Sequence, residues 1–221
     1  MLKKLLCGAT LLCAATIAQA GVIEQEFNVE VQDTDFDTTI TFMKFDDMDG
    51  ARKLTSVMFS IDGSVFGSAE VESRDASAQV IETTLSAELT LTNGMNTLVV
   101  TIPSITNTFN ATAFDGVNDA GGTSGITYPD LEANQFEMET YTDAMTLATF
   151  TGVGTIDTDF DAAATSRAIG AGNITTTFFS QAGGLVKVKY TYENMEVSAP
   201  SQVAFLGLGL LAFAGMRKIR K

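Results

Sequence analysis

The sequence predicts an all-β fold for residues 21–197, an antiparallel β-sandwich of jelly-roll-like form. Apolar and polar residues alternate along several short segments, most clearly at residues 185–192, as they do in strands with one buried face. Glycine-containing turn pairs separate these segments. Apolar residues show no helical period in this range, which fits a sandwich of many short strands. A signal helix and a membrane sorting helix are expected to flank the sandwich.

Four segments have the clearest alternation, and each predicts one buried face. Threonine-rich segments predict further strands at residues 38–45, 97–102, 145–156 and 174–179. Turns are expected at Asp49-Gly50, Asp62-Gly63, Asn93-Gly94 and Gly183-Gly184, and a long loop over one end of the sandwich at residues 109–134. The four predicted buried faces are Phe27, Val29 and Val31; Val57, Phe59 and Ile61; Leu85, Ala87, Leu89 and Leu91; and Val186, Val188, Tyr190 and Tyr192.

Charge divides the chain into an acidic middle and two basic ends. All 27 acidic residues lie between Glu24 and Glu196, whereas six of the 13 basic residues lie outside that range. Residues 21–197 therefore carry 7 basic and 27 acidic residues, a formal charge of −20. Such a surface repels phosphate, so no nucleic-acid partner is expected, while divalent cations or cationic surfaces are suitable partners.

The first 20 residues have the pattern of a cleavable secretory signal peptide. Two lysines open the segment, residues 5–17 are apolar, and Ala18 and Ala20 form the small-x-small pattern before a cut at Gly21. We therefore expect residues 1–20 to be removed on export.

Residues 198–221 predict a membrane sorting segment. Pro200 and Ser201 precede an unbroken apolar run at residues 203–216, which as a helix would span about 21 Å of a roughly 30 Å hydrocarbon core. The run has no polar stripe, which argues against a buried core helix. A basic cluster follows and should stay in the cytoplasm, leaving the acidic domain outside. The cluster consists of Arg217, Lys218, Arg220 and Lys221.

The order of Pro200-Ser201, a Leu/Gly-rich apolar segment and a basic end resembles the PEP-CTERM sorting signals that an exosortase reads in Gram-negative bacteria. Ser198-Ala199 stands where that family has Pro-Glu. The resemblance implies an exosortase-type processing enzyme as a partner, anchoring in the inner membrane during sorting, and a final location at the cell surface or outside the cell.

Three strings in the middle resemble the choice-of-anchor family of bacterial surface domains, most closely its type E. They are Phe45-Asp46 followed by Gly50 and Leu54-Thr55-Ser56-Val57; Thr151-Gly152-Val153-Gly154-Thr155-Ile156; and Val188-Lys189-Tyr190-Thr191-Tyr192. Together they extend over most of residues 21–197. The resemblance implies an exported all-β domain joined to a surface anchor, and it brings no established activity or catalytic residues.

The residue types present exclude several kinds of catalytic site. The chain has no histidine, and both cysteines, Cys7 and Cys13, lie in the predicted signal peptide. Ser-His-Asp and Cys-His arrangements and zinc sites built on these residues are therefore excluded. We expect no enzymatic activity, with a carboxylate-dependent hydrolase as the most distant alternative.

The motif Asp-Thr-Asp-Phe-Asp occurs twice and supplies weak candidates for calcium ligands. Neither copy has the sixth-position glycine and twelfth-position glutamate of an EF-hand loop. A solvated strand face is the favoured interpretation, unless a turn folds one copy or the two copies meet. The acids of two other segments, Asp46, Asp47 and Asp49 with Asp115 and Asp119, are interpreted as turn formers. The calcium candidates are Asp33, Asp35, Asp37, Asp157, Asp159 and Asp161.

These observations together predict an exported protein of the bacterial envelope, surface-anchored or secreted, with a structural or biofilm-matrix role. The alternative is a module that binds calcium or an extracellular polysaccharide. No cofactor is expected, and calcium is the one alternative kept open.

Overall fold

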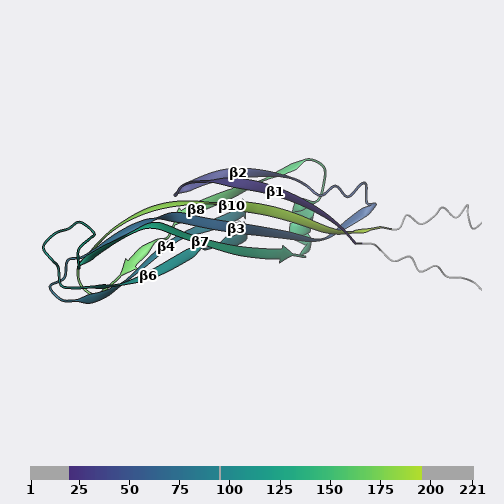
Figure 1. The fold of residues 1–221 in the computed structure, drawn as a ribbon. Coiled ribbons are helices and arrows are strands. Elements are labelled where there is room, and N and C mark those ends of the chain that lie inside the picture. The colour runs from purple at the N-terminus through teal and green to yellow at the C-terminus, as the bar shows by residue number, and fades with distance from the viewer. Residues whose placement is uncertain (1–19, 95, 196–221) are drawn as a thin grey trace, which may run out of the picture.

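The computed structural model describes residues 20–94 and 96–195, which form two antiparallel sheets packed face to face (Figure 1). The first sheet contains, in spatial order, β1 (Ala20–Asp33), β10 (Ile174–Asn194), β3 (Arg52–Ser73) and β7 (Gly125–Tyr141). The second sheet contains β2 (Phe36–Met43), β8 (Thr155–Ala164), β4 (Gln79–Asn93) and β5 (Asn96–Thr101), with β6 (Ser104–Ala111) and β9 (Arg167–Ile169) also paired to β4. The predicted all-β sandwich is confirmed. The predicted signal and sorting helices lie outside the described residues.

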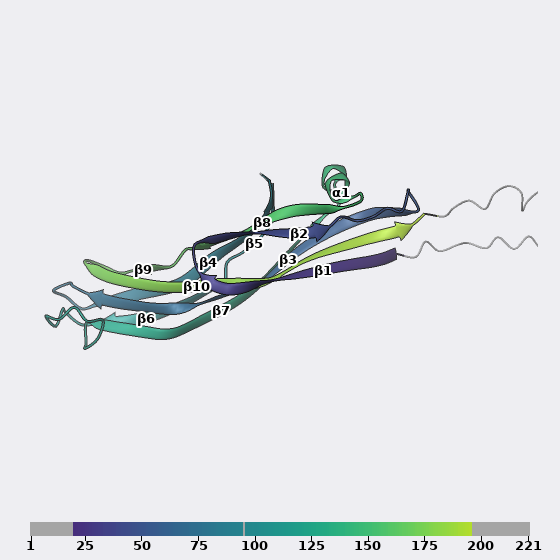
Figure 2. The ribbon, with the colours of Figure 1, turned by 90° about the horizontal axis from the view of Figure 1, so that it is seen from above.

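The strand pairing is nested from the ends of the described chain inward. β1 pairs with β10, β2 with β8, β3 with β7 and β4 with β5, each pair antiparallel. A long antiparallel ribbon folded over in this way has the connectivity of a jelly roll. Because Ala20 pairs with Glu193, the described chain starts and ends at the same pole of an elongated molecule (Figures 1 and 2).

The core between the sheets is built from the alternating residues that the sequence singles out. The three predicted residues of β3, all four of β4, and Val186, Val188 and Tyr190 of β10 are fully buried. The predicted face of β1 is only partly right, since Val29 is 4% exposed but Phe27 and Val31 are 39% and 47% exposed. β1 is an edge strand, and its register with β10 shifts after Val29, which turns the following residues out of the core.

Two of the four predicted turns are wrong. Asn93-Gly94 and Asp49-Gly50 do lie in turns, but Gly63 and Gly184 pair with each other in the middle of β3 and β10. A Cβ atom on Gly63 would lie 2.5 Å from Leu89 Cδ1, and one on Gly184 would lie 2.7 Å from the Asp62 carbonyl oxygen. Glycine is needed at these positions because neighbouring groups approach closely. In the sequence, such a glycine cannot be told from the glycine of a turn.

The strand predicted at residues 145–156 is also wrong, because its first half is the helix α1 (Ala144–Phe150). The Asp143 side chain caps this helix by accepting a hydrogen bond from the Thr146 N–H at 2.9 Å. Leu147 and Phe150 then face the core three residues apart, while Met145 is 80% exposed. The N-cap and the three-residue apolar spacing outweigh the strand propensity of the threonines.

The loop predicted at residues 109–134 is shorter than expected. β6 continues to Ala111 and β7 begins at Gly125, so only residues 112–124 connect them, at the pole opposite the chain ends (Figure 1). The strand predicted at residues 174–179 is the first part of β10. The strands predicted at residues 38–45 and 97–102 correspond to β2 and β5.

Tyr190 links the two sheets through its hydroxyl group. The side chain is fully buried, its O–H donates to the Met43 carbonyl oxygen of β2 at 3.0 Å, and its ring centroid lies 6.1 Å from that of Phe45. Burial raises the pKa of Tyr190 well above its usual value.

We predict that Tyr190→Phe lowers the free energy of unfolding by about 0.5–1.5 kcal/mol, the net value of one hydrogen bond. Urea unfolding measures this change. The folded state holds the Tyr190 proton to higher pH than the unfolded state, whose pKa is near 10.0, so stability should fall as pH rises above that value. Part of this alkaline loss should disappear in the variant. Equal alkaline slopes in the two proteins would contradict the assignment.

Candidate functional site

The two Asp-Thr-Asp-Phe-Asp copies come together at one point, the outer face of the second sheet where β2 begins. The second copy lies wholly within β8, where Asp157, Asp159 and Asp161 are exposed on the same face. The first copy spans the turn from β1 to β2, and its last residue, Asp37, pairs directly with Asp161. The arrangement is a row of carboxylates along β8 with one more beside its end.

Threonine hydroxyls bind two carboxylates of this row. Thr41 donates to Asp157 Oδ1 at 2.7 Å, and Thr39 donates to Asp159 Oδ1 at 3.1 Å. These bonds run across the strand pair between exposed residues, as expected of a solvated strand face.

The first two acids of the first copy are held by other groups. The Gln181 amide donates to Asp33 Oδ1 at 2.8 Å, and the Ala164 backbone N–H donates to Asp35 Oδ1 at 2.6 Å. Among residues 20–94 and 96–195, no three acidic, histidine or cysteine side chains are grouped so that they could hold a metal ion between them. The six calcium candidates are therefore spread along the turn and the strand face.

The interpretation of loop acids as turn formers is confirmed for three residues. Asp46, Asp115 and Asp119 each accept a hydrogen bond from the backbone N–H two residues later, at 2.9–3.0 Å. This bond lowers the pKa of Asp115, because it favours the charged carboxylate.

The residues predicted for export fall at the edge of the described region. Ala20 and Gly21 open β1, opposite Glu193 and Tyr192 of β10, so a cut before Gly21 would leave that residue paired. Ala18 and the sorting residues Pro200, Ser201, Arg217, Lys218, Arg220 and Lys221 lie outside the described residues. Nowhere in residues 20–94 and 96–195 does a helix have the length and apolar character to cross a bilayer.

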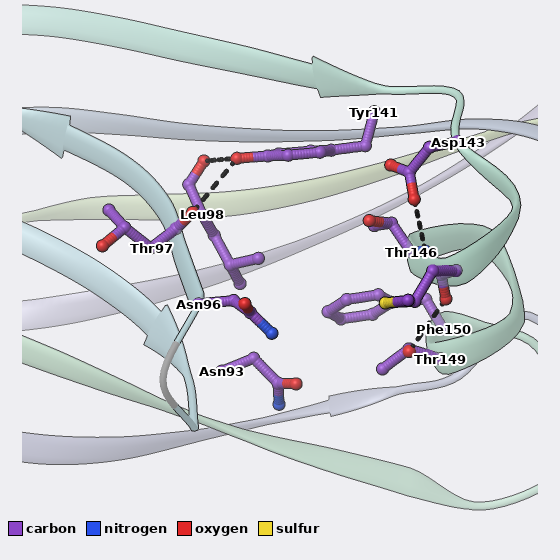
Figure 3. Close-up of a pocket in the computed structure, with 10 residues that line it drawn as sticks. Asn93, Asn96, Thr97, Leu98, Tyr141, Asp143, Thr146, Thr149 and Phe150 are labelled. Atoms are coloured by element: carbon purple, nitrogen blue, oxygen red, sulfur yellow. Dashed lines mark hydrogen bonds between the residues drawn. The ribbon is translucent and has the colours of Figure 1, made fainter.

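A cleft of about 340 Å³ opens between α1 and the β4–β5 connection, and the sequence analysis did not predict it (Figure 3). Apart from Tyr141 and Asp143, its polar lining consists of amides and hydroxyls, contributed by Asn93, Asn96, Thr97, Thr146 and Thr149. The signal that could have revealed it is the Asp143 cap, because that cap marks the start of α1, and α1 forms one wall of the cleft.

Tyr141 and Asp143 fix the wall of this cleft. The Tyr141 O–H donates to the Leu98 carbonyl oxygen at 2.7 Å, and its partial burial, with the charges of Glu139 and Asp143, raises its pKa. Hydrogen bonds from Thr146 lower the pKa of Asp143. Asp143 is the one carboxyl group among the described residues that line the cleft.

A lone carboxyl group with a lowered pKa does not suit general acid catalysis, which in glycosidases uses a raised pKa and a second carboxylate. The amides and hydroxyls can instead form hydrogen bonds with a neutral, hydroxyl-bearing ligand such as a sugar. Polysaccharide binding stays a prediction.

No protein-family model matches the chain, and no curated protein matches it. Among solved structures, it is similar to the infectious bursal disease virus VP2 subviral particle, at 12% identity over 86% of this chain and 42% of that chain, with a TM-score of 0.17. It is also similar to T=1 particles derived from that virus, at 11% identity over 92% and 51% of the two chains, with a TM-score of 0.18. The chain thus spans about half the length of these proteins, and at these TM-scores the similarity carries no inference about it.

The carboxylates of Asp37 and Asp161 face each other across a strand pair, so they should repel. We predict that Asp161→Asn raises the free energy of unfolding by about 0.2–1 kcal/mol at low ionic strength, and that the gain shrinks in salt. Asp159→Asn is the matched control, because Asp159 lies opposite Thr39 and not opposite another acid, so the same loss of charge should not raise stability there. Urea unfolding at two salt concentrations measures both variants. A loss of stability in Asp161→Asn would contradict the predicted repulsion between the two carboxylates.

Proposed function

We propose that the chain is an exported, surface-anchored or secreted β-sandwich of the bacterial envelope, without enzymatic activity and with a structural or matrix role. Its export signal is the predicted signal peptide, which ends at Ala20. Its sorting element is the segment at residues 198–221, which an exosortase-type enzyme processes at the inner membrane.

The observation that carries this proposal is the pairing of Gly21, the expected first residue of the mature protein, with Tyr192 near the end of β10. During export, before the signal is cleaved, the signal peptide and the C-terminal segment would both lie in one membrane, and a domain whose two ends leave it on the same side fits that arrangement. The described chain begins and ends at one pole, with loop 112–124 at the other (Figure 2). This geometry suits a domain that stands on a membrane and points its long axis away from it.

The surface chemistry supports a non-enzymatic role outside the cytoplasm. The formal charge of −20 over residues 21–197 keeps such a domain soluble and away from phosphate-rich polymers. The cleft beside α1 contains one carboxyl group with a lowered pKa, which suits binding better than acid–base chemistry.

We predict that replacing Arg217, Lys218, Arg220 and Lys221 with Gln scrambles the topology of the tail or releases unprocessed protein, because these charges resist translocation. Deleting residues 198–221 should give a secreted acidic domain. Fractionation of a host that carries an exosortase measures both outcomes.

The matched control replaces four basic residues of the sandwich, Lys44, Lys53, Arg167 and Lys189, and should be sorted like wild type. If the tail variant is retained, processed and displayed like wild type, the basic cluster is not a sorting element and the proposed route is wrong.

A further inference from the structure

Glu72 is a buried carboxylate at the pole opposite the chain ends, and one of its oxygens has no partner. It lies in β3 between Thr175 of β10 and Gly125 of β7, yet it is only 2% exposed. The Ser124 hydroxyl donates to Oε1 at 2.6 Å, whereas Oε2 accepts no hydrogen bond. A buried carboxylate oxygen without a partner destabilises the fold unless a cation or a proton compensates for it.

The loop that follows β6 buries this carboxylate. The Ser124 hydroxyl also accepts from the Asp115 N–H at 3.2 Å, and the Ser73 N–H donates to the Ser124 carbonyl oxygen at 2.8 Å. A Cβ atom on Gly125 would lie 2.2 Å from Glu72 Oε2 and 2.6 Å from the Gly121 backbone nitrogen, so only glycine fits between the carboxylate and the loop backbone. Contacts of Ser124 and Gly125 therefore pack the loop directly against the Glu72 carboxylate.

A cavity of about 140 Å³ lies beside Glu72, between the loop and the outer face of the first sheet. Three carboxylates line it, together with one amide and two hydroxyls, and none of its lining residues is basic. They are Glu70, Glu72, Asp119, Asn118, Thr175 and Thr177, with Ala120. The volume is sufficient for an ion with several water molecules.

We propose that this cavity is a calcium site and that Glu72 Oε2 is its anchoring ligand. Oxygen donors of this mixture, with negative charge and no nitrogen or sulfur, suit a hard cation, and calcium accepts six to eight of them in irregular geometry. The acids of the described chain do not form a tight group of three, so the amide, the hydroxyls and water complete the shell. Extracellular modules of this type bind calcium with a Kd of about 10⁻⁴–10⁻³ M.

This site goes beyond the proposed function and does not depend on it, because binding is measurable whatever the location of the protein. It also differs from the six repeat carboxylates, which lie on the other sheet, in the β1–β2 turn or, for Asp33, at the end of β1.

The test compares the thermal unfolding of the full chain, purified in detergent, with chelator and with 10 mM calcium chloride at constant ionic strength. We predict that calcium raises the Tm of wild type by about 3–6 °C. Glu72→Gln should lose this rise, and without calcium it should be at least as stable as wild type, because the unpaired charge is gone. Asp161→Asn, which alters the acidic row of β8, should keep the full rise.

Magnesium chloride at the same concentration controls for general screening of a strongly acidic chain, and its effect should be smaller and unchanged by Glu72→Gln. Hydrogen exchange gives a local measurement, since calcium should slow exchange at residues 115–125 in wild type alone.

Two results would overturn the proposal. One is an equal calcium response in wild type and Glu72→Gln, which would mean that Oε2 does not hold the ion. The other is an unchanged Tm in wild type at 10 mM calcium. If Glu72→Gln does not fold, Asp119→Asn, on an exposed part of the loop, replaces it and is judged by the same criterion.

Discussion

The pairing of β1 with β10 is the contact on which the rest of the sandwich depends. It joins the two ends of the described chain, and β10 in turn holds β3, which places the long strands of the first sheet in register. Lys187 of β10 reaches two carboxylates of β1, with Nζ 3.7 Å from Glu24 and 2.5 Å from Glu26. The other pairs of the ribbon are nested inside this one, so β1 and β10 bring together the segments most distant in sequence, and each inner pair shortens the loop that this contact has to close.

The same closure must overcome the repulsion of a surface with a formal charge of −20 over residues 21–197. The described part of the chain relies on few ion pairs for this purpose. It instead distributes its acids over the outer faces and gives many of them uncharged donors, such as Thr41 for Asp157 and the Val117 N–H for Asp115. Glu72 is the exception, because its surroundings leave one buried oxygen without any donor. None of the residues that line the cavity beside Glu72 is basic. A bound cation would therefore supply the positive charge that these carboxylates lack.

The sequence was sufficient to predict the strands that have one solvent-exposed and one buried face. Period-two alternation has a single physical cause, and it correctly identified the cores of β3, β4 and β10. It failed where one residue pattern serves two purposes. Gly63 and Gly184 let neighbouring side-chain and backbone groups approach closely inside long strands. The dipeptides Asp62-Gly63 and Gly183-Gly184 nevertheless have the composition of turns. α1 was missed because its threonines favour strands. The feature that favours a helix, the Asp143 N-cap, is a single residue and gives only a weak local signal.

The candidate sites were harder to predict because they depend on contacts between distant segments. The cleft beside α1 combines residues of the β4–β5 connection with others some fifty positions later. The burial of Glu72 depends on a loop that returns to β3 after three further strands. Neither arrangement has a local signature. By contrast, the export signals are local patterns by nature, so the sequence alone can propose them.

The proposal that the chain is an exported domain is tested most directly by N-terminal sequencing of the protein recovered outside the cytoplasm. We predict a start at Gly21, the position at which β1 keeps its pairing with Tyr192 of β10. A protein that still carries residues 5–17 would contradict export by a cleaved signal.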